Sequence, residues 1–207
     1  MDLKSTYNKI AEDWDNDHTH DEWWKLGLEK FVALLKPGSS VLDVGCGSGV
    51  KSEILAKKGM TVTGIDFSEK MLEIAKRRAP NGDFQLVDLY DLSAFNKKFD
   101  GIFAQAVLLH IPKKDIEKVI HSLKEKLNPG GYFYVAVKER RLDEKEEEIV
   151  KENDYGYEYE RFFSYFTVTK MKKYFLDVGL EIVYQDTVHS GRRNWIQIIG
   201  KEGLNNR

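Results

Sequence analysis

The chain has 207 residues, of which 42% are hydrophobic and 32% charged, a balance that excludes a disordered chain, a collagen and a membrane-spanning protein. The formal net charge of -2 argues against a nucleic-acid partner, because proteins that neutralise phosphates are usually clearly basic. Cys46 is the only cysteine, so no disulfide is expected within the chain. The N-terminus shows no signal-peptide pattern, and together these features predict a cytoplasmic protein with no membrane partner.

Short apolar runs and helical patterns alternate along most of the chain, after an N-terminal helical segment at residues 1–35. The apolar runs predict five strands, at residues 41–44, 61–66, 84–88, 99–105 and 132–137. Helices are expected to begin near Val50, after Ser68 as the N-cap, and near Pro112. This alternation predicts a mainly parallel sheet with helices on both faces.

The C-terminal part of the chain departs from this rhythm. Residues 180–184 and 195–199 are strand-like and are joined by a connection too short for a parallel crossover, so an antiparallel hairpin is expected. Before them, residues 139–166 interrupt the pattern. The charged start of this segment, residues 139–148, predicts a solvated helix face. The alternating aromatic residues that follow predict a strand or lid with one aromatic face.

The most informative stretch is a glycine loop that follows the first strand and opens a helix. It reads Asp43-Val-Gly45-Cys-Gly47-Ser-Gly49, with glycines at alternate positions after an acid. Glycine permits a positive φ and a close approach of the backbone to a ligand, and the helix behind it presents free N–H groups. A dinucleotide fingerprint would need its third glycine at Val50, and Asp43 would repel a pyrophosphate. The loop therefore favours an ammonium or sulfonium ligand.

Five motifs in this order resemble the class I S-adenosylmethionine-dependent methyltransferases, in particular their small-molecule branch, and the resemblance covers nearly the whole chain. The motifs are residues 41–49, 64–68, 87–89, 99–103 and 127–131. The C-terminal hairpin resembles the reversed seventh strand of that family. The resemblance implies a Rossmann-like, doubly wound α/β sheet of seven strands, mainly parallel with an antiparallel C-terminal strand. It also implies a single domain over residues 1–207, with 1–35 as a helical cap and 139–166 as an insertion over the substrate pocket.

The resemblance further implies S-adenosyl-L-methionine as the cofactor. Asp66 would accept hydrogen bonds from both ribose hydroxyls. Asp88 would meet the adenine amino group and the Leu89 N–H a ring nitrogen, with a simple turn acid as the other interpretation of Asp88. The N-terminal helix would fold over the methionine end, although ordinary packing could also explain its aromatic residues. The full set of expected cofactor contacts is Tyr7, Trp14, Asp43, Gly45, Cys46, Gly47, Gly49, Asp66, Phe67, Asp88, Leu89 and Gln105.

Catalytic and substrate residues are less marked, because methyl transfer from a sulfonium mainly requires alignment. His110 follows the fourth strand and is the candidate general base, with a structural or capping role as the alternative. Such a base is needed only for an acceptor that arrives protonated, and its pKa would lie near ~6.5, shifted by its surroundings. In the insertion, the candidates for the substrate pocket are Tyr155, Tyr157, Tyr159 and Arg161, with core packing as the alternative.

The predicted function is transfer of a methyl group to O, N or C of a small molecule. No metal site is expected, since His18 and His20 stand two apart in what looks like a solvated linker. A non-catalytic S-adenosylmethionine-binding module and a nicotinamide-dependent oxidoreductase are the alternatives, and Val50 argues against the second. A nucleic-acid base methyltransferase is disfavoured, because Gln105-Ala-Val-Leu replaces the Asn/Asp-Pro-Pro-aromatic stretch expected there. The protein is expected to be a monomer or a homodimer.

Overall fold

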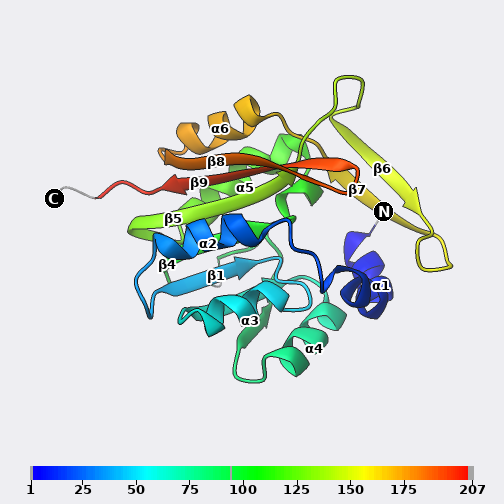
Figure 1. Cartoon of the computed structure of the whole chain (residues 1–207), viewed down its shortest axis with the longest axis horizontal. Coiled ribbons are helices and arrows are strands. Elements are labelled where there is room, and N and C mark those ends of the chain that lie inside the picture. The colour runs from blue at the N-terminus through cyan, green and yellow to red at the C-terminus, as the bar shows by residue number, and fades with distance from the viewer. Residues whose placement is uncertain (1, 94, 205–207) are drawn as a thin grey trace.

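In the computed structural model, which describes residues 2–93 and 95–204, a seven-stranded sheet carries helices on both faces and a separate two-stranded arm (Figure 1). The strands of the large sheet are β1 (Ser40–Val44), β2 (Thr61–Asp66), β3 (Asp83–Leu86), β4 (Phe99–Gln105), β5 (Leu127–Lys138), β8 (Glu181–Ser190) and β9 (Arg193–Lys201). Across the sheet their order is β3-β2-β1-β4-β5-β9-β8, with parallel pairing from β3 to β5. Strand β9 runs antiparallel to both of its neighbours. The expected seven-stranded sheet with a reversed C-terminal strand is confirmed.

Helices lie on both faces of the sheet. They are α1 (Leu3–His18), α2 (Lys25–Ala33), α3 (Val50–Lys57), α4 (Glu69–Arg78), α5 (Lys113–Lys124) and α6 (Val168–Asp177), with a short 3-10 turn, η1 (Leu108–His110). Helices α5 and α6 pack on one face of the sheet and α2 and α3 on the other. Helix α1 packs against α4 instead of against the strands of the large sheet. As expected, Ser68 caps α4, because its hydroxyl accepts a hydrogen bond from the Met71 N–H.

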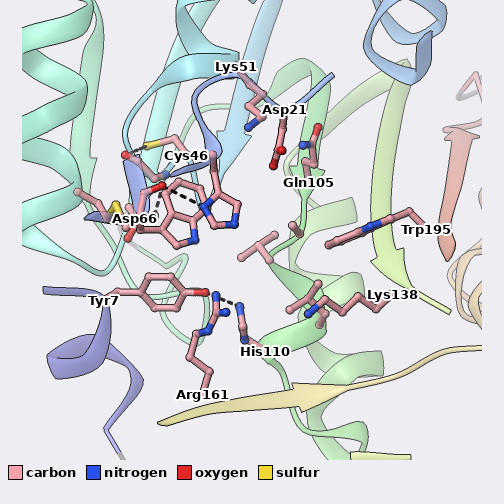
Figure 2. Close-up of a pocket in the computed structure, with 18 of the residues that line it drawn as sticks. Tyr7, Asp21, Cys46, Lys51, Asp66, Gln105, His110, Lys138, Arg161 and Trp195 are labelled. Atoms are coloured by element: carbon pink, nitrogen blue, oxygen red, sulfur yellow. Dashed lines mark hydrogen bonds between the residues drawn. The ribbon is translucent and has the colours of Figure 1, made fainter. Parts of the chain in front are cut away.

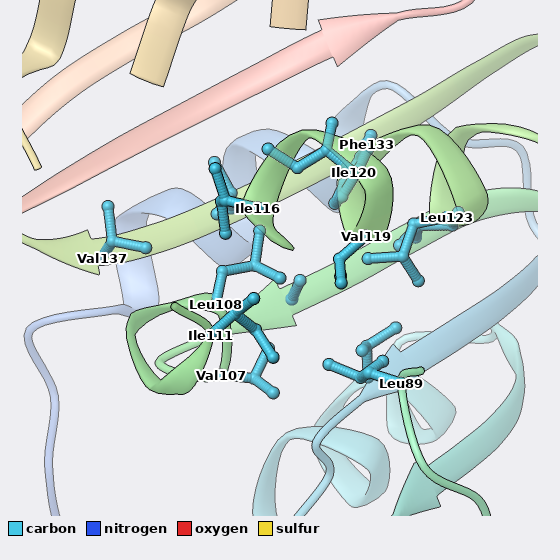
Figure 3. Packing of buried hydrophobic residues seen from close by; sticks show 14 of the residues in the cluster. Leu89, Val107, Leu108, Ile111, Ile116, Val119, Ile120, Leu123, Phe133 and Val137 are labelled. Carbon is cyan, nitrogen blue, oxygen red and sulfur yellow. The ribbon is translucent and has the colours of Figure 1, made fainter. Parts of the chain in front are cut away.

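Strand β5 contributes side chains to two hydrophobic cores, one on each face of the sheet. Phe133 and Val135 face α5 and α6, while Tyr134 and Ala136 face α2 and α3. Figure 3 shows the first of these cores, with the apolar side of α5 lying against β5. A strand buried on both faces needs apolar residues at successive positions, which is why residues 132–137 read as one continuous run. This two-sided burial fixes the strand ends at which the site is built.

The insertion differs from its prediction. Residues 139–148 form no helix; they lead into β6 (Glu147–Glu152), which pairs antiparallel with β7 (Tyr159–Ser164). Ile149 and Val150 are β-branched and suit a strand better than a helix. The predicted aromatic strand begins only at Tyr159, so Tyr155 and Tyr157 lie in the connection. The arm lies beside α1, where Thr6 Oγ1 donates to the Glu160 carbonyl at 3.1 Å (Figure 1).

Element boundaries differ from the sequence prediction at a few other places. Strand β3 ends at Leu86, so Asp88 stands two residues beyond it. Helix α5 ends at Lys124, and β5 already begins at Leu127, so the predicted turn at 128–131 lies within the strand. Among the described residues, no helix is both long and apolar enough to cross a membrane. Residues 1, 94 and 205–207 of the expected single domain lie outside the described residues.

Candidate functional site

A cavity of about 270 Å³ lies at the carboxyl ends of β1 and β4. These two strands are neighbours at the point where the strand order reverses, which is where open α/β sheets bind their ligands. One side of the cavity is formed by the glycine loop after β1 and by the residues after β2 (Figure 2). The other walls come from α1, the end of β5, strand β7 and the β8–β9 hairpin.

The glycine loop takes the backbone conformation that its sequence predicts. Gly45, Gly47 and Gly49 have φ angles of 62°, 54° and 80°. Gly45 and Gly47 line the cavity, and a Cβ on Gly45 would lie 2.5 Å from Cγ2 of Val107. Gly49 does not line the cavity. A Cβ on Gly49 would lie 2.9 Å from the Cβ of Ala75 on α4, so glycine lets the two helices approach there. The third glycine therefore serves helix packing, and the first two bring bare backbone to the cavity.

Asp66 joins the second strand to this loop. Its carboxylate accepts hydrogen bonds from the Gly47 N–H at 2.9 Å and from the Ser68 N–H at 2.8 Å. The side chain is buried, and burial raises its pKa to about 6. Each carboxylate oxygen can still accept a further hydrogen bond, and the group lines the cavity. A ligand that presents two hydroxyls would satisfy both oxygens.

A second polar group gathers around Asp43, whose carboxylate accepts a hydrogen bond from the Ser52 hydroxyl at 2.5 Å. Burial raises the pKa of Asp43 to about 7, and burial lowers the pKa of Lys51 on the first turn of α3. Figure 2 shows Lys51, Asp21 and Gln105 on one side of the cavity. Gln105 Oε1 is buried and has no hydrogen-bond partner among the described residues. Lys51 could bind a carboxylate, and the free Gln105 Oε1 could accept from an ammonium. Together they suit a ligand that carries both groups.

His110 lies in the cavity wall with both ring nitrogens engaged. Nδ1 must donate to the Phe162 carbonyl at 2.7 Å, because a carbonyl can only accept. In the neutral ring Nε2 is then the acceptor, and the Tyr7 hydroxyl donates to it at 2.7 Å. Burial, together with the charges of Arg161 and Lys138, lowers the pKa of His110 to about 3. The ionisation expected near ~6.5 is therefore displaced to much lower pH.

Helix α1 contributes Trp14 and Tyr7 to the cavity lining, and their expected contact with a cofactor stays a prediction. Arg78 of α4 fastens this helix, donating to both Asp15 oxygens at 2.6 and 2.8 Å and to the Ser48 carbonyl at 3.0 Å. The expectation that His18 sits in a solvated linker is wrong. It is the last residue of α1, and its ring stacks on Trp14 with centroids 4.5 Å apart.

The end of the cavity away from the glycine loop contains one of the four substrate candidates, Arg161. Tyr155, Tyr157 and Tyr159 are not among the lining residues. The Tyr157 hydroxyl donates to Asp13 at 2.6 Å, and the rings of Tyr155 and Tyr159 stack 5.5 Å apart. These three tyrosines thus brace the arm and α1, and their predicted contact with a substrate stays a prediction.

Asp88 and Leu89 also lie outside the cavity lining. The exposed Asp88 carboxylate accepts a hydrogen bond from the Tyr90 N–H at 3.0 Å, the arrangement of a turn acid. The Leu89 side chain is buried in the core shown in Figure 3. Their expected contact with an adenine ring stays a prediction, as does the role of Phe67 and Cys46, which do line the cavity.

Sequence reasoning missed several lining residues. Lys51 stands two positions after the last loop glycine, a spacing that could have drawn attention to it. Asp21 lies in the turn between α1 and α2 and carried no signal. Others are brought to the cavity only by the tertiary fold: Trp23, Met71, Lys138, Phe163, Ser190, Arg193 and Trp195.

The family model described as a methyltransferase domain matches residues 17–185 of the chain. The chain belongs to this methyltransferase family. Among curated relatives, the ubiquinone biosynthesis O-methyltransferase of Coxiella burnetii is 32% identical over 153 residues, covering 66% of this chain and 61% of the relative. The enzyme of the same name from Actinobacillus pleuropneumoniae is 38% identical over 159 residues, covering 66% and 64%. The chain thus spans less than two thirds of the length of these methyltransferases.

Solved methyltransferase structures share the fold. The Burkholderia thailandensis 1,6-didemethyltoxoflavin-N1-methyltransferase, solved with 1,6-didemethyltoxoflavin and S-adenosylhomocysteine, superposes with a TM-score of 0.78 at 17% identity, covering 97% of this chain and 87% of that one. The magnesium protoporphyrin IX methyltransferase of Synechocystis PCC 6803, solved with S-adenosylmethionine, gives 0.72 at 21% identity, covering 97% and 95%. At these identities the likeness concerns the fold alone.

Proposed function

We propose that the protein is an S-adenosyl-L-methionine-dependent methyltransferase that transfers a methyl group to O, N or C of a small molecule. The observation that carries the proposal is the positive-φ glycine loop held by the buried Asp66 carboxylate at the switch point of the sheet. Family membership favours methyl transfer over nicotinamide chemistry. The small-molecule acceptors in the relatives' names support the acceptor class. We further propose a cytoplasmic monomer or homodimer with no nucleic-acid partner, in keeping with the net charge of -2.

The described residues fit this cofactor. Asp66 keeps lone pairs for two ribose hydroxyls after accepting from two backbone N–H groups. Gln105, with its unpartnered Oε1, suits the methionine ammonium, and Lys51 suits the methionine carboxylate. Trp14 and Phe67 add aromatic surface to the cavity wall. The acidic Asp43 adds a favourable field for a ligand that carries positive charge.

The contribution of the chain to the reaction is alignment and exclusion of water. S-adenosylmethionine supplies an activated methyl group on a sulfonium. Holding two reactants in line is worth as much as ~7–11 kcal/mol. Tyr7 and Trp14 on α1 and Phe163 on β7 enclose the space in which the acceptor would meet that group. His110 holds the Tyr7 hydroxyl through Nε2, and its role as a general base stays a prediction that concerns protonated acceptors only.

Thermal unfolding in the presence of S-adenosylhomocysteine tests the proposal. At a hundredfold excess over its dissociation constant the ligand should stabilise the protein by about 2.7 kcal/mol. For a chain of this length that corresponds to a rise in Tm of roughly 5–10 °C. NAD at the same concentration should leave Tm unchanged. Transfer of labelled methyl from S-adenosylmethionine into a metabolite extract would then separate an enzyme from a binding module.

A matched pair of variants makes the test specific to the site. Asp66→Asn should weaken S-adenosylhomocysteine binding by about 1–3 kcal/mol, because the ribose hydroxyls lose a charged acceptor. Asp91→Asn is the control, since Asp91 also follows a strand and accepts a backbone N–H but lies outside the cavity. A Tm shift with NAD alone, or equal losses of affinity for the two variants, would contradict the proposed cofactor site.

A further inference from the structure

Three basic residues stand at the end of the cavity opposite the glycine loop. Lys138 ends β5, Arg161 lies on β7, and Arg193 begins β9. In Figure 2 Lys138 and Trp195 lie across the cavity from Cys46 and Asp66, with Arg161 below. If the cofactor occupies the loop side, in line with the proposed function, this basic end is where the acceptor must sit. Its charge balance therefore bears on the chemistry of the acceptor.

The two arginines are already neutralised by acids. Nε and Nη2 of Arg161 each donate to a separate oxygen of Glu152, both at 2.6 Å. Arg193 donates to Glu144, with contacts of 2.5 and 2.7 Å between their nitrogens and oxygens. Such two-point pairs occupy two nitrogens of each guanidinium and give its charge a carboxylate counterion. Each arginine therefore offers a ligand less than a full, unpaired positive charge.

Lys138 has no such partner. Its Nζ makes no hydrogen bond and no ion pair with any residue that the structure describes, and it lies 3.8 Å from the ring centroid of Phe163 and 5.9 Å from that of Trp195. Burial, with the nearby charges of Arg161 and Arg193, lowers its pKa to about 8. The ammonium is therefore still mostly charged at pH 7. A partly buried cation without a counterion is costly, so this end of the cavity carries one uncompensated positive charge.

We propose that Lys138 binds a carboxylate on an aromatic methyl acceptor, and this inference rests on the proposed function. A singly charged anion balances one free ammonium, whereas a phosphate would need the arginines that Glu144 and Glu152 occupy. The neighbouring walls are aromatic: Phe163 stands beside Lys138, and Trp195 stacks on Trp23 with centroids 4.0 Å apart. The aromatic ring of the acceptor would lie beside these walls with its acidic group toward Nζ.

Calorimetry on the protein saturated with S-adenosylhomocysteine tests this assignment. The probes are benzoate with benzamide, and 1-naphthoate with 1-naphthamide, so that each pair keeps the same ring and nearly the same shape while the amide carries no charge. The wild type should bind each carboxylate about tenfold or more tightly than its amide. Lys138→Met, which keeps the apolar stem, should abolish the preference, and Lys138→Arg should retain it. Lys201→Met is the matched control, because Lys201 lies over the Tyr132 ring on the same sheet but outside the cavity.

The pH dependence gives a check that needs no variant. In the wild type the preference for the carboxylate should shrink as the pH rises past about 8, because Lys138 then loses its proton. The other charged or titratable groups at this end do not lose charge there: Arg161 and Arg193 stay paired with Glu152 and Glu144, and the pKa of His110 is about 3.

The outcomes separate this inference from the proposed function. If S-adenosylhomocysteine itself fails to bind the wild type, the proposed function is wrong. If it binds but neither carboxylate binds better than its amide, or no probe binds at all, the carboxylate site is wrong and the cofactor assignment stands. A preference that survives unchanged in Lys138→Met would likewise overturn the role of Lys138.

Discussion

Single residues in the cavity take their properties from burial more than from their type. His110 follows the fourth strand, where a histidine with an ordinary pKa could act as a base at neutral pH. Its Nδ1–H is bound to a backbone carbonyl and its Nε2 to the Tyr7 hydroxyl, and its pKa falls to about 3. Asp43 and Asp66 are shifted the other way, to about 7 and about 6, because burial disfavours the charged carboxylate. Buried groups with shifted pKa values around a cavity are typical of functional sites.

The neutral state of His110 should appear in the pH dependence of stability. The folded-state pKa of about 3 lies below the ordinary histidine value of 6.5, so the contribution of His110 is fully present above pH 6.5 and is lost as the pH falls toward 3. The Tm of the wild type should therefore fall relative to that of His110→Asn between pH 7 and pH 4. The asparagine amide can keep the donation to Phe162 without titrating in this range. Parallel Tm curves, or an imidazole signal that titrates near 6.5 by NMR, would contradict this.

At the scale of elements, one enclosed pair of charges, Asp15 with Arg78, joins α1 to α4. The Asp15 and Arg78 side chains are 14% and 20% exposed, and Arg78 also reaches the Ser48 carbonyl beside the glycine loop. A second pair links the same two helices, Glu12 with Arg77, but these side chains are 69% and 59% exposed. Exposed pairs contribute only about 0–1 kcal/mol, whereas removing one partner of an enclosed two-point pair costs more.

We expect Asp15→Asn to weaken S-adenosylhomocysteine binding several-fold and to speed proteolysis within α1, because Trp14 and Tyr7 reach the cavity only from a docked helix. Glu12→Gln should change neither property. Calorimetry and timed proteolysis of both variants give the comparison. Equal effects of the two substitutions would show that the Asp15–Arg78 pair has no special part in holding the helix.

The sequence predicted the elements whose signals are local. The glycine loop, the cap at Ser68 and the helix start near Pro112 each lie within one short segment, and all are found in the structure. The charge pattern of residues 139–148 predicted a helix, and this was wrong: Glu139 forms a bridge to Phe166, and Glu147 and Glu148 already pair with β7. Lys138 and Trp195 could not be found in advance. They meet only because β5 pairs with β9 in the register that places them opposite each other.

At the scale of the whole molecule, the cavity lies between a firm sheet and a lightly attached cover. Strands β4 and β5 are buried on both faces by α2, α3, α5 and α6. Helix α1 buries only Ile10 and Ala11 fully and is held to α4 and the arm mainly by polar contacts. Segments with few buried apolar contacts open at lower free energy than the core. Helix α1, which covers the cavity, is therefore the segment expected to open when a ligand enters.

Hydrogen exchange measured with and without S-adenosylhomocysteine should therefore divide the molecule into two parts. In the free protein, amides of α1 should exchange well before those of β4 and β5. Bound ligand stabilises only states in which its contacts are formed, and those contacts come from both α1 and the glycine loop. Protection should thus rise together in residues 3–18 and 43–51, with little change in α6, which lines no part of the cavity. If α1 already exchanges as slowly as β4 in the free protein, it is part of the core and not a cover. If the ligand protects residues 43–51 alone, α1 takes no part in binding, and Tyr7 and Trp14 do not contact the cofactor.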